Sequence, residues 1–213
     1  MKTKLLTAIF GALVLLTIAP AQTPAPTSSP ATAAPVDAAA LHQLGVERLQ
    51  QKNAREAVAF AEQATKADPT RPEYFSQLGI ALSERMDEVN FMQLPVLAGK
   101  LRKAFEKSIT LDPNHVPGLI GLARFYAQAP EIAGGSLEKA AEFAARVRQI
   151  DPATGEAELG RVAERGEDFA GALAHYETAA QLKPDSAGRL SSCGRMLAKL
   201  GRKDEAARVS KPR

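Results

Sequence analysis

The sequence has few of the residues on which many catalytic and metal sites depend. It contains no tryptophan, one cysteine and three histidines among 213 residues, and its aromatic content is 5%. The single cysteine, Cys193, excludes a disulfide within the chain. His42, His115 and His175 are too far apart in sequence to form a His-x3-His metal motif. We therefore expect no metal, no cofactor and no catalytic centre.

The chain also lacks a strong charge of one sign. It has 27 Lys and Arg against 24 Asp and Glu, which gives a formal net charge of +3. Without Lys2 and Lys4, which belong to the N-terminal segment described next, 25 basic residues stand against 24 acidic ones, or +1. Nucleic-acid-binding domains are usually markedly basic, so we expect no nucleic-acid partner.

Residues 1–21 have the three parts of an export signal. Lys2 and Lys4 precede the apolar run 5–18, and Ala19-Pro20-Ala21 forms a small-residue cleavage site. Because the run is shorter than the roughly 20 residues that cross a bilayer, we predict cleavage after Ala21 and an exported protein that is periplasmic or secreted. The alternative is an uncleaved membrane anchor, and membrane contact is expected only in that case.

A stretch rich in Pro, Ala, Thr and Ser follows at residues 22–37, with no charge before Asp37. Such a composition buries too little apolar surface to offset the entropy of ordering. We therefore expect a disordered linker. The remaining residues, 38–213, are enough for one domain with a continuous core.

Glycines recur at nearly constant spacing in residues 38–213. Five of them, separated by 34, 42, 39 and 34 residues, each follow a residue suited to a core: Gly45, Gly79, Gly121, Gly160 and Gly194. A period near 34 is typical of stacked helix pairs. Small residues allow two helices to approach closely while larger residues fill the surrounding space. We therefore predict an all-α fold, a right-handed superhelical stack (α-solenoid) of about five helix hairpins.

A second series of residues keeps phase with the glycines. Prolines precede the later glycines at Pro69, Pro113, Pro152 and Pro184. Pairs of apolar residues four apart recur as Ala57 with Ala61, Leu101 with Phe105, Ala140 with Ala144, and Ala172 with Tyr176. With these features the sequence resembles the tetratricopeptide repeat family, including its exported bacterial members. It departs from the family pattern in having no tryptophan and in having alanine twice in place of the aromatic residue. The resemblance implies repeats at about 38–71, 72–113, 114–152 and 153–186 and a partial repeat at 187–213.

The second and third repeats carry insertions. In the second repeat we expect both helices to be extended, with Pro95 beginning the return helix. The inserted segment contains six apolar residues that we expect to pack on a neighbouring repeat: Val89, Phe91, Met92, Leu94, Val96 and Leu97. The alternative is an exposed apolar patch, which would mark a contact surface.

The third repeat contains Gly134-Gly135-Ser136 before a helical segment with a lysine. A Walker-type phosphate loop needs two glycines five residues apart, then Lys and Ser or Thr, after a buried strand. None of these features surrounds Gly134. We therefore predict a hinge in which Ser136 caps the next helix, and keep weak anion binding at that helix N-terminus as the alternative.

The first helices of stacked pairs line the inner surface of such a stack. The family pattern implies a partner-binding groove lined by His42, Leu49, Glu84, Phe125, Tyr126, Arg161, Arg165, Arg195 and Lys199, with Val46, Gln50, Glu73, Ser76, Ile80, Leu122 and Glu164 among them. One end is predicted to be apolar and aromatic, and the other basic. This gradient suits an extended peptide with a hydrophobic part and a carboxylate, because arginine pairs bidentately with carboxylates. An ordinary solvated basic face and binding to anionic wall polymer or lipid headgroups are the alternatives.

These observations predict a non-catalytic scaffold of the bacterial cell envelope that binds a peptide or protein segment in its groove. The alternatives are an accessory domain of an envelope enzyme and a self-associating structural repeat protein that forms homo-oligomers. We interpret Cys193 as a core residue, since it precedes a repeat glycine and no histidine is close in sequence to activate it.

Overall fold

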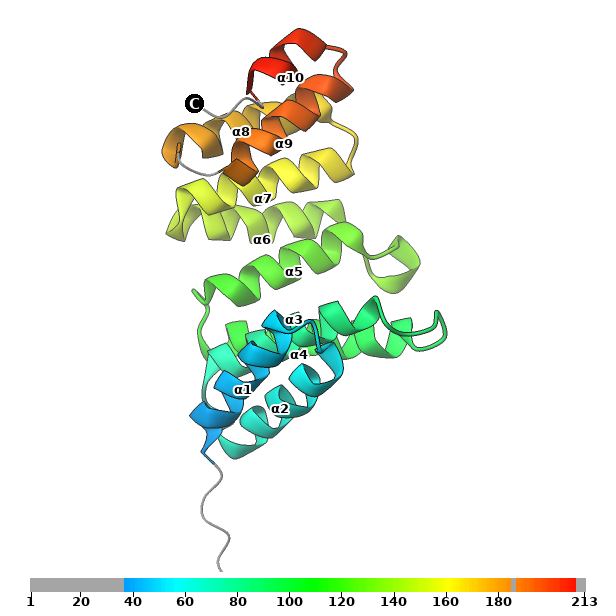
Figure 1. The fold of residues 1–213 in the computed structure, drawn as a ribbon, viewed down its shortest axis with the longest axis vertical. Helices are drawn as coiled ribbons and strands as arrows, with labels where there is room; N and C mark the ends of the chain where they lie inside the picture. The colour runs from blue at the N-terminus through cyan, green and yellow to red at the C-terminus, as the bar shows by residue number, and fades with distance from the viewer. Residues whose placement is uncertain (1–36, 185–186, 210–213) are drawn as a thin grey trace, which may run out of the picture. The chain divides into compact units, whose positions relative to one another are not determined.

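A computed structural model describes residues 37–184 and 187–209 of the chain. All regular structure in these residues is helical, and ten α-helices follow one another in chain order (Figure 1). The predicted all-α fold is thereby confirmed. The predicted export signal (1–21) and linker (22–37) lie, apart from Asp37, outside the described residues.

The helices form five pairs, and the first helices of the pairs make a common layer. The helices are α1 (Ala38–Gln50), α2 (Ala54–Ala67), α3 (Pro72–Met86), α4 (Leu94–Leu111), α5 (Val116–Gln128), α6 (Leu137–Ile150), α7 (Pro152–Arg165), α8 (Phe169–Leu182), α9 (Ala187–Lys199) and α10 (Lys203–Val209), with a 3₁₀ turn, η1 (Glu131–Ala133), between α5 and α6. Each helix packs against the next one in the chain, and in addition α1 contacts α3, α3 contacts α5, and α5 contacts α7. We call α1, α3, α5 and α7 the odd layer.

Side-chain caps and prolines define where the helices begin. At five helix starts a side chain accepts a hydrogen bond from a backbone N–H two or three positions later: Asp37, Asn53, Ser136, Asp151 and Asp168. Proline stands in the first turn of α3, α4, α5 and α7, where its missing N–H has no helical partner to lose. The cap predicted at Ser136 is confirmed.

Alanines of the even-numbered helices make close contacts possible in the core. Seven of them are fully buried: Ala57, Ala61 and Ala64 on α2, Ala140 and Ala144 on α6, and Ala172 and Ala179 on α8. Large side chains fill the remaining volume, among them Phe105, Leu122 and Tyr176. The core therefore combines close backbone approach with a few large residues, as close packing requires.

Phe105 of α4 packs against two of the repeat glycines at once. A Cβ atom on Gly79 would lie 2.6 Å from its ring, and a Cβ atom on Gly121 would overlap the ring as well. Gly79 belongs to the same helix pair as Phe105, whereas Gly121 lies on α5 of the following pair. Gly160 instead faces Tyr176 of its own pair, 2.8 Å from where its Cβ would be. Gly121 of α5 thus faces the preceding pair, whereas Gly79 and Gly160 face their own pairs. α5 therefore presents a different side to its neighbours than α3 and α7 do.

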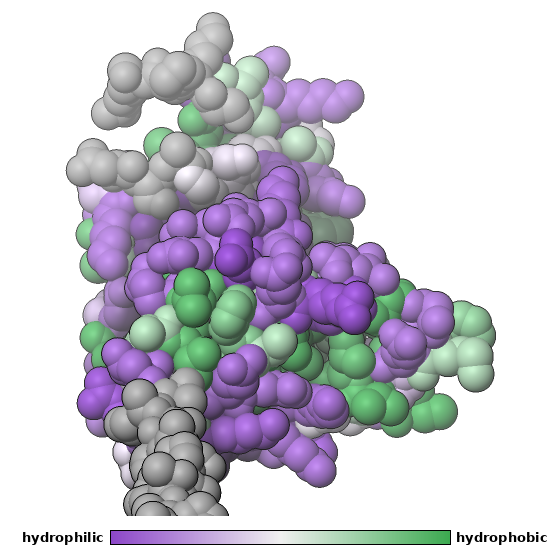
Figure 2. Space-filling view, turned by 60° about the horizontal axis from the view of Figure 1, so that its bottom comes forward, coloured by the Kyte–Doolittle hydropathy of each residue, from purple (hydrophilic) through white to green (hydrophobic). Residues whose placement is uncertain are grey.

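The lengthened second pair ends in an exposed apolar turn. α4 has 18 residues against 14 in α2, and Pro95 lies in its first turn. Leu97 packs against the core, but Phe91, Met92 and Val96 are 79%, 75% and 61% exposed. The expectation that all six inserted apolar residues pack on a neighbouring repeat is wrong for these three, because the turn projects past the adjacent helices (Figure 1). The lobe on the right of Figure 2 carries this apolar surface.

The loop between α5 and α6 uses its N–H groups internally. The N–H groups of Ala133, Gly134, Gly135 and Ser136 each donate to a backbone carbonyl at 2.8–3.0 Å. Gly134 has a φ of 90°, a conformation that favours glycine, and a Cβ atom on Gly135 would clash with the carbonyl of Ala129. The glycines therefore serve a tight turn, and these four donors are not free to hold a phosphate.

We predict that Gly121→Ala destabilises the protein and that Gly99→Ala does not. The new methyl group at residue 121 would overlap the buried Phe105 ring, and overpacking of this kind costs about 1–3 kcal/mol. Gly99 lies in α4, where an added Cβ meets nothing within 4 Å. Alanine there should stabilise the helix by about 0.5–1 kcal/mol. Urea unfolding of both variants measures the difference, and equal midpoints would contradict the close contact.

Asp151 is expected to make the stability depend on pH at acid values. Its carboxylate accepts from the Thr154 hydroxyl at 2.7 Å and from the Thr154 N–H at 3.1 Å, and Lys183 lies 3.2 Å away. These contacts, the Thr154 hydroxyl above all, lower the pKa of Asp151 from 3.8 to about 2. A lowered folded-state pKa stabilises the folded protein above the unfolded-state value, and this stabilisation is lost as the pH falls through the folded-state pKa.

The test compares the melting temperatures of the native protein and of Asp151→Asn. The native protein should melt higher at pH 7, and the difference should shrink between about pH 4 and pH 2, since protonation then removes the charge that the variant lacks. A difference that is the same at pH 7 and pH 2 would show that the charge of Asp151 contributes nothing.

Candidate functional site

Two pockets lie along the odd layer, one where α1 and α3 end, beside the turns that follow them, and one between α5 and α7. The acidic pocket, of about 250 Å³, is lined by Leu49, Lys52, Ala54, Glu84, Asp87 and Glu88, where the end of α1 meets the end of α3. The arginine pocket, of about 150 Å³, lies between α5 and α7 and is lined by Ala123, Arg124, Ala127, Gln128, Glu158, Arg161, Val162 and Arg165. Two predicted groove residues, Leu49 and Glu84, share the first pocket, and Arg161 and Arg165 share the second.

The acidic pocket has more carboxylates than cations. Glu84, Asp87 and Glu88 line it with Lys52, and Glu88 is already paired with Arg85 at 2.6 Å. Leu49 adds an apolar wall. The pocket therefore suits a basic or apolar group of a ligand better than an acidic one.

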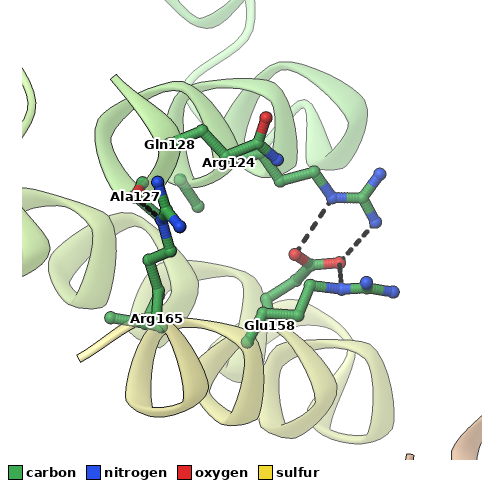
Figure 3. Close-up of a pocket in the computed structure, with 8 residues that line it drawn as sticks. Arg124, Ala127, Gln128, Glu158 and Arg165 are labelled. Atoms are coloured by element: carbon green, nitrogen blue, oxygen red, sulfur yellow. Dashed lines mark hydrogen bonds and ion pairs between the residues drawn. The ribbon is translucent and has the colours of Figure 1, made fainter. Parts of the chain in front are cut away.

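One buried carboxylate organises the arginine pocket. The residue Glu158 of α7 is 3% exposed, and its two oxygens accept hydrogen bonds from the Nε and Nη2 atoms of Arg124 at 3.1 and 2.6 Å (Figure 3). The Nε atom of Arg161, one turn further along α7, lies 3.4 Å from the same carboxylate. The hydrogen bonds to Glu158 raise the pKa of the Arg124 guanidinium further above its usual value. This pair joins α5 to α7 with a bidentate, charge-assisted contact.

Arg165 forms the opposite wall of the arginine pocket. Its Nε atom donates to the carbonyl oxygen of Ala127 at 3.2 Å, and Gln128 also lines the pocket (Figure 3). None of the described carboxylates pairs with Arg165. The guanidinium therefore lies at the pocket with its charge uncompensated by a direct ion pair.

The structure places the predicted groove residues of α5 differently. Leu122 is fully buried, and Tyr126 is 8% exposed and stacks on Phe143 with 5.7 Å between ring centroids. Phe125 is half-buried and packs against the same core. Because α5 is turned towards Phe105, its exposed positions beyond the first turn are Arg124 and Gln128, which lie in the arginine pocket.

Sequence reasoning missed Arg124, Gln128 and Glu158. A signal for the first two was present, because Arg124 is the only charged residue of α5 and a charge in an otherwise apolar helix marks its solvent side. Glu158 gave no such signal, since a glutamate on a helix is usually a solvated residue.

The basic residues of α9 are partly engaged within the chain. Arg195 donates to Glu164 through Nε at 3.0 Å and Nη2 at 2.8 Å, and the Tyr176 hydroxyl donates to the same carboxylate at 2.9 Å. Burial alone would raise the pKa of Glu164, but the hydrogen bonds from Arg195 and Tyr176 outweigh it and lower that pKa. Lys199 lies 5.5 Å from the centre of the Phe169 ring. These two cations are less available to a ligand than Arg165.

His42, His115 and Cys193 contact other residues of the chain, and His175 lies 2.7 Å from the carboxylate of Glu156. The His42 ring lies 4.9 Å from the Tyr74 ring, and the Nε2 atom of His115 is 2.9 Å from the Ser76 hydroxyl. Cys193 is 3% exposed, and burial raises the pKa of its thiol, which disfavours the reactive thiolate. In residues 37–184 and 187–209, no three His, Cys, Asp or Glu side chains gather as a metal site would require. Over the same residues, none of the helices combines the length and apolarity needed to span a membrane.

Comparison with known proteins identifies the repeat. Residues 38–71, which form α1, α2 and the turn before α3, match the tetratricopeptide repeat model. No curated protein matches the sequence.

Solved structures with the same fold are distant in sequence. The crystal structure of TTC0263, a thermophilic TPR protein of Thermus thermophilus, has a TM-score of 0.66 and 21% identity over 81% of this chain and 87% of that one. PilF of Pseudomonas aeruginosa has a TM-score of 0.62 and 17% identity over 83% and 77%. MamA from Desulfovibrio magneticus RS-1, from residue 41 to its end, has a TM-score of 0.57 and 19% identity over 81% and 90%.

These comparisons agree with the helix pairs described above. The match at residues 38–71 and the similarity of the remaining pairs to solved TPR proteins show that the chain has the helical repeat fold of tetratricopeptide repeat proteins, a fold typical of protein-interaction scaffolds.

Proposed function

We propose that this protein is a non-catalytic scaffold of the cell envelope that binds a segment of another protein along the odd layer. The observation that carries the proposal is the pair of oppositely charged pockets on that layer, one between α1 and α3 and one between α5 and α7. Repeat proteins of this kind present an extended surface built from successive helices, and a polypeptide segment can contact several helices at once.

The chemistry of the described residues supports a binding role. The charged side chains at the arginine pocket are engaged in ion pairs or exposed, and Cys193 is buried. A catalytic site would need an acid, base or nucleophile poised near a reacting group, and the two pockets instead offer fixed charges and apolar walls. Such sites select a ligand by complementarity.

Position-specific crosslinking in the cells that make the protein tests this proposal. A photoreactive phenylalanine analogue would replace Ile80 of α3 or Ile120 of α5, and, as matched controls, Lys103 of α4 or Glu142 of α6. Ile80 is 42% exposed, so its side chain is accessible. We expect both odd-layer positions to give a covalent adduct with one common protein, and the control positions to give none.

Other adducts would speak against the proposal. Equal labelling from both sets of positions would mean that the odd layer is not the binding surface. Adducts composed of two copies of this chain would favour the self-associating structural role instead.

Export is proposed from the N-terminal sequence, and it is tested separately. We expect the protein isolated from the envelope fraction to begin at Gln22, because Ala19-Pro20-Ala21 supplies the small residues that a signal peptidase requires. N-terminal sequencing measures this directly. A protein that retains Met1 or stays in the cytoplasmic fraction would contradict it.

A further inference from the structure

Exposed apolar side chains and exposed lysines adjoin each other at the start of α4. Phe91 and Met92 precede the helix, Val96 lies in its first turn, and all three are largely exposed. We call these three residues the apolar tip. Neighbouring exposed apolar side chains of this size mark a contact with another molecule or with a membrane.

The lysines continue the exposed side of α4 beyond the apolar tip. Lys100, Lys103 and Lys107 follow Val96 at intervals of four, three and four residues, which places all four on one face of the helix. The three lysines are exposed, and we call them the lysine row. This face of α4 is therefore apolar where the helix begins and basic further along.

The chain neutralises only part of this charge. Lys100 lies 3.9 Å from Glu62, and both side chains are exposed, so this ion pair is weak. None of the described carboxylates pairs with Lys103 or Lys107. Over residues 85–111 five cations stand against three carboxylates, a sum of +2.

The turn between α5 and α6 presents another apolar side chain at the same edge. Figure 1 shows that this turn projects on the same side of the stack as the turn between α3 and α4. Ile132 of η1 is 99% exposed. The edge therefore offers apolar side chains from two separate turns.

We propose that this edge binds the surface of an anionic lipid bilayer, with the apolar tip among the acyl chains and the lysine row at the headgroups. Apolar side chains at a bilayer surface enter about 5–10 Å beyond the headgroups. Lys100 and Lys103 lie about 6 and 10 Å further along α4 than Val96, which places their ammonium groups at the level of the lipid phosphates. Unlike the membrane contact expected from the sequence, this one needs no N-terminal anchor.

Charge favours an anionic bilayer over a second copy of this chain. A second copy docked on the apolar tip would bring another lysine row beside the first, and like charges repel. An anionic lipid surface instead attracts each lysine near it. This contact goes beyond the partner binding proposed above and uses none of the residues that line the arginine pocket.

Sedimentation with lipid vesicles tests the inference. The protein that begins at Gln22 keeps every described helix but lacks the apolar run 5–18. We expect it to bind vesicles of phosphatidylcholine and phosphatidylglycerol in equal parts at least about tenfold more tightly than vesicles of phosphatidylcholine alone, and less tightly at high salt. Equal binding to both kinds of vesicle, or binding to neither, would overturn the inference.

Variants assign the binding to the two parts of the edge. Phe91→Ser should weaken binding to the mixed vesicles by about tenfold, because a phenylalanine side chain no longer leaves water. Lys103→Gln should weaken it by about fivefold, the effect of one lysine near an anionic surface. Leu182→Ser on α8 and Lys66→Gln on α2 remove an exposed apolar residue and an exposed lysine elsewhere. These matched controls should bind like the native protein, and unchanged binding of Phe91→Ser or Lys103→Gln would contradict the proposed contact.

A single introduced tryptophan shows which residues enter the bilayer. The chain contains no tryptophan, so Phe91→Trp, Ile132→Trp and Leu182→Trp each carry one reporter. On the mixed vesicles we expect the emission of the first two to shift to shorter wavelength and to be quenched by lipids brominated in their acyl chains. The emission of Leu182→Trp should not change, and a response equal to that of Phe91→Trp would overturn the proposed orientation.

Light scattering without lipid tests the other occupant. We expect the protein that begins at Gln22 to be a monomer. A dimer that Phe91→Ser converts to a monomer would assign the apolar tip to a second copy of the chain and would remove the membrane contact.

Discussion

The close approach of neighbouring helices is the constraint on which the rest of this structure depends. Glycine and alanine at the crossings let backbones come near, and one large ring fills what remains. Phe105 lies against Gly79 of its own pair and Gly121 of the next. With Gly121 facing Phe105, α5 exposes Arg124 to solvent and places Tyr126 in the core against Phe143.

The same packing explains the electrostatics of the odd layer. Because α5 presents Arg124 towards α7, the carboxylate of Glu158 can be buried with two hydrogen bonds from one guanidinium. A carboxylate buried without such a partner would be costly. Further along α7, Glu164 is held in the same way by Arg195 and Tyr176. The basic character expected from sequence therefore remains mainly at Arg161 and Arg165. Arg161 shares the carboxylate of Glu158 with Arg124, and Arg165 pairs with none of the described carboxylates.

The repeat fold could be predicted from sequence because its cause is local and periodic. Gly79 and Gly160 each contact an aromatic ring of their own helix pair, Phe105 and Tyr176. Both partners of each contact therefore belong to one repeat and can be recognised from the repeat pattern. The side that α5 presents to its neighbours could not be predicted in this way. Gly121 stands at the expected position of the repeat, but it packs on Phe105 of the preceding pair. The exposure of the turn that contains Phe91 was expected only as the alternative, for a related reason. Apolar residues tend to be buried, but the turn between α3 and α4 is buried only if an adjacent helix is long enough to cover it. The spacing of the repeat residues does not predict the lengths of the adjacent helices.

The last described helix, α10, is less buried than the α-helices before it. α9 packs against α8, while α10 has seven residues, none of them buried, and packs against α9. A short helix that buries none of its residues opens at a lower free energy than the buried helices in the middle of the stack. Cys193 and Met196 lie in the core with Tyr176 and against residues of α10. Local opening of α10 is therefore expected to leave these two buried side chains less well shielded from solvent.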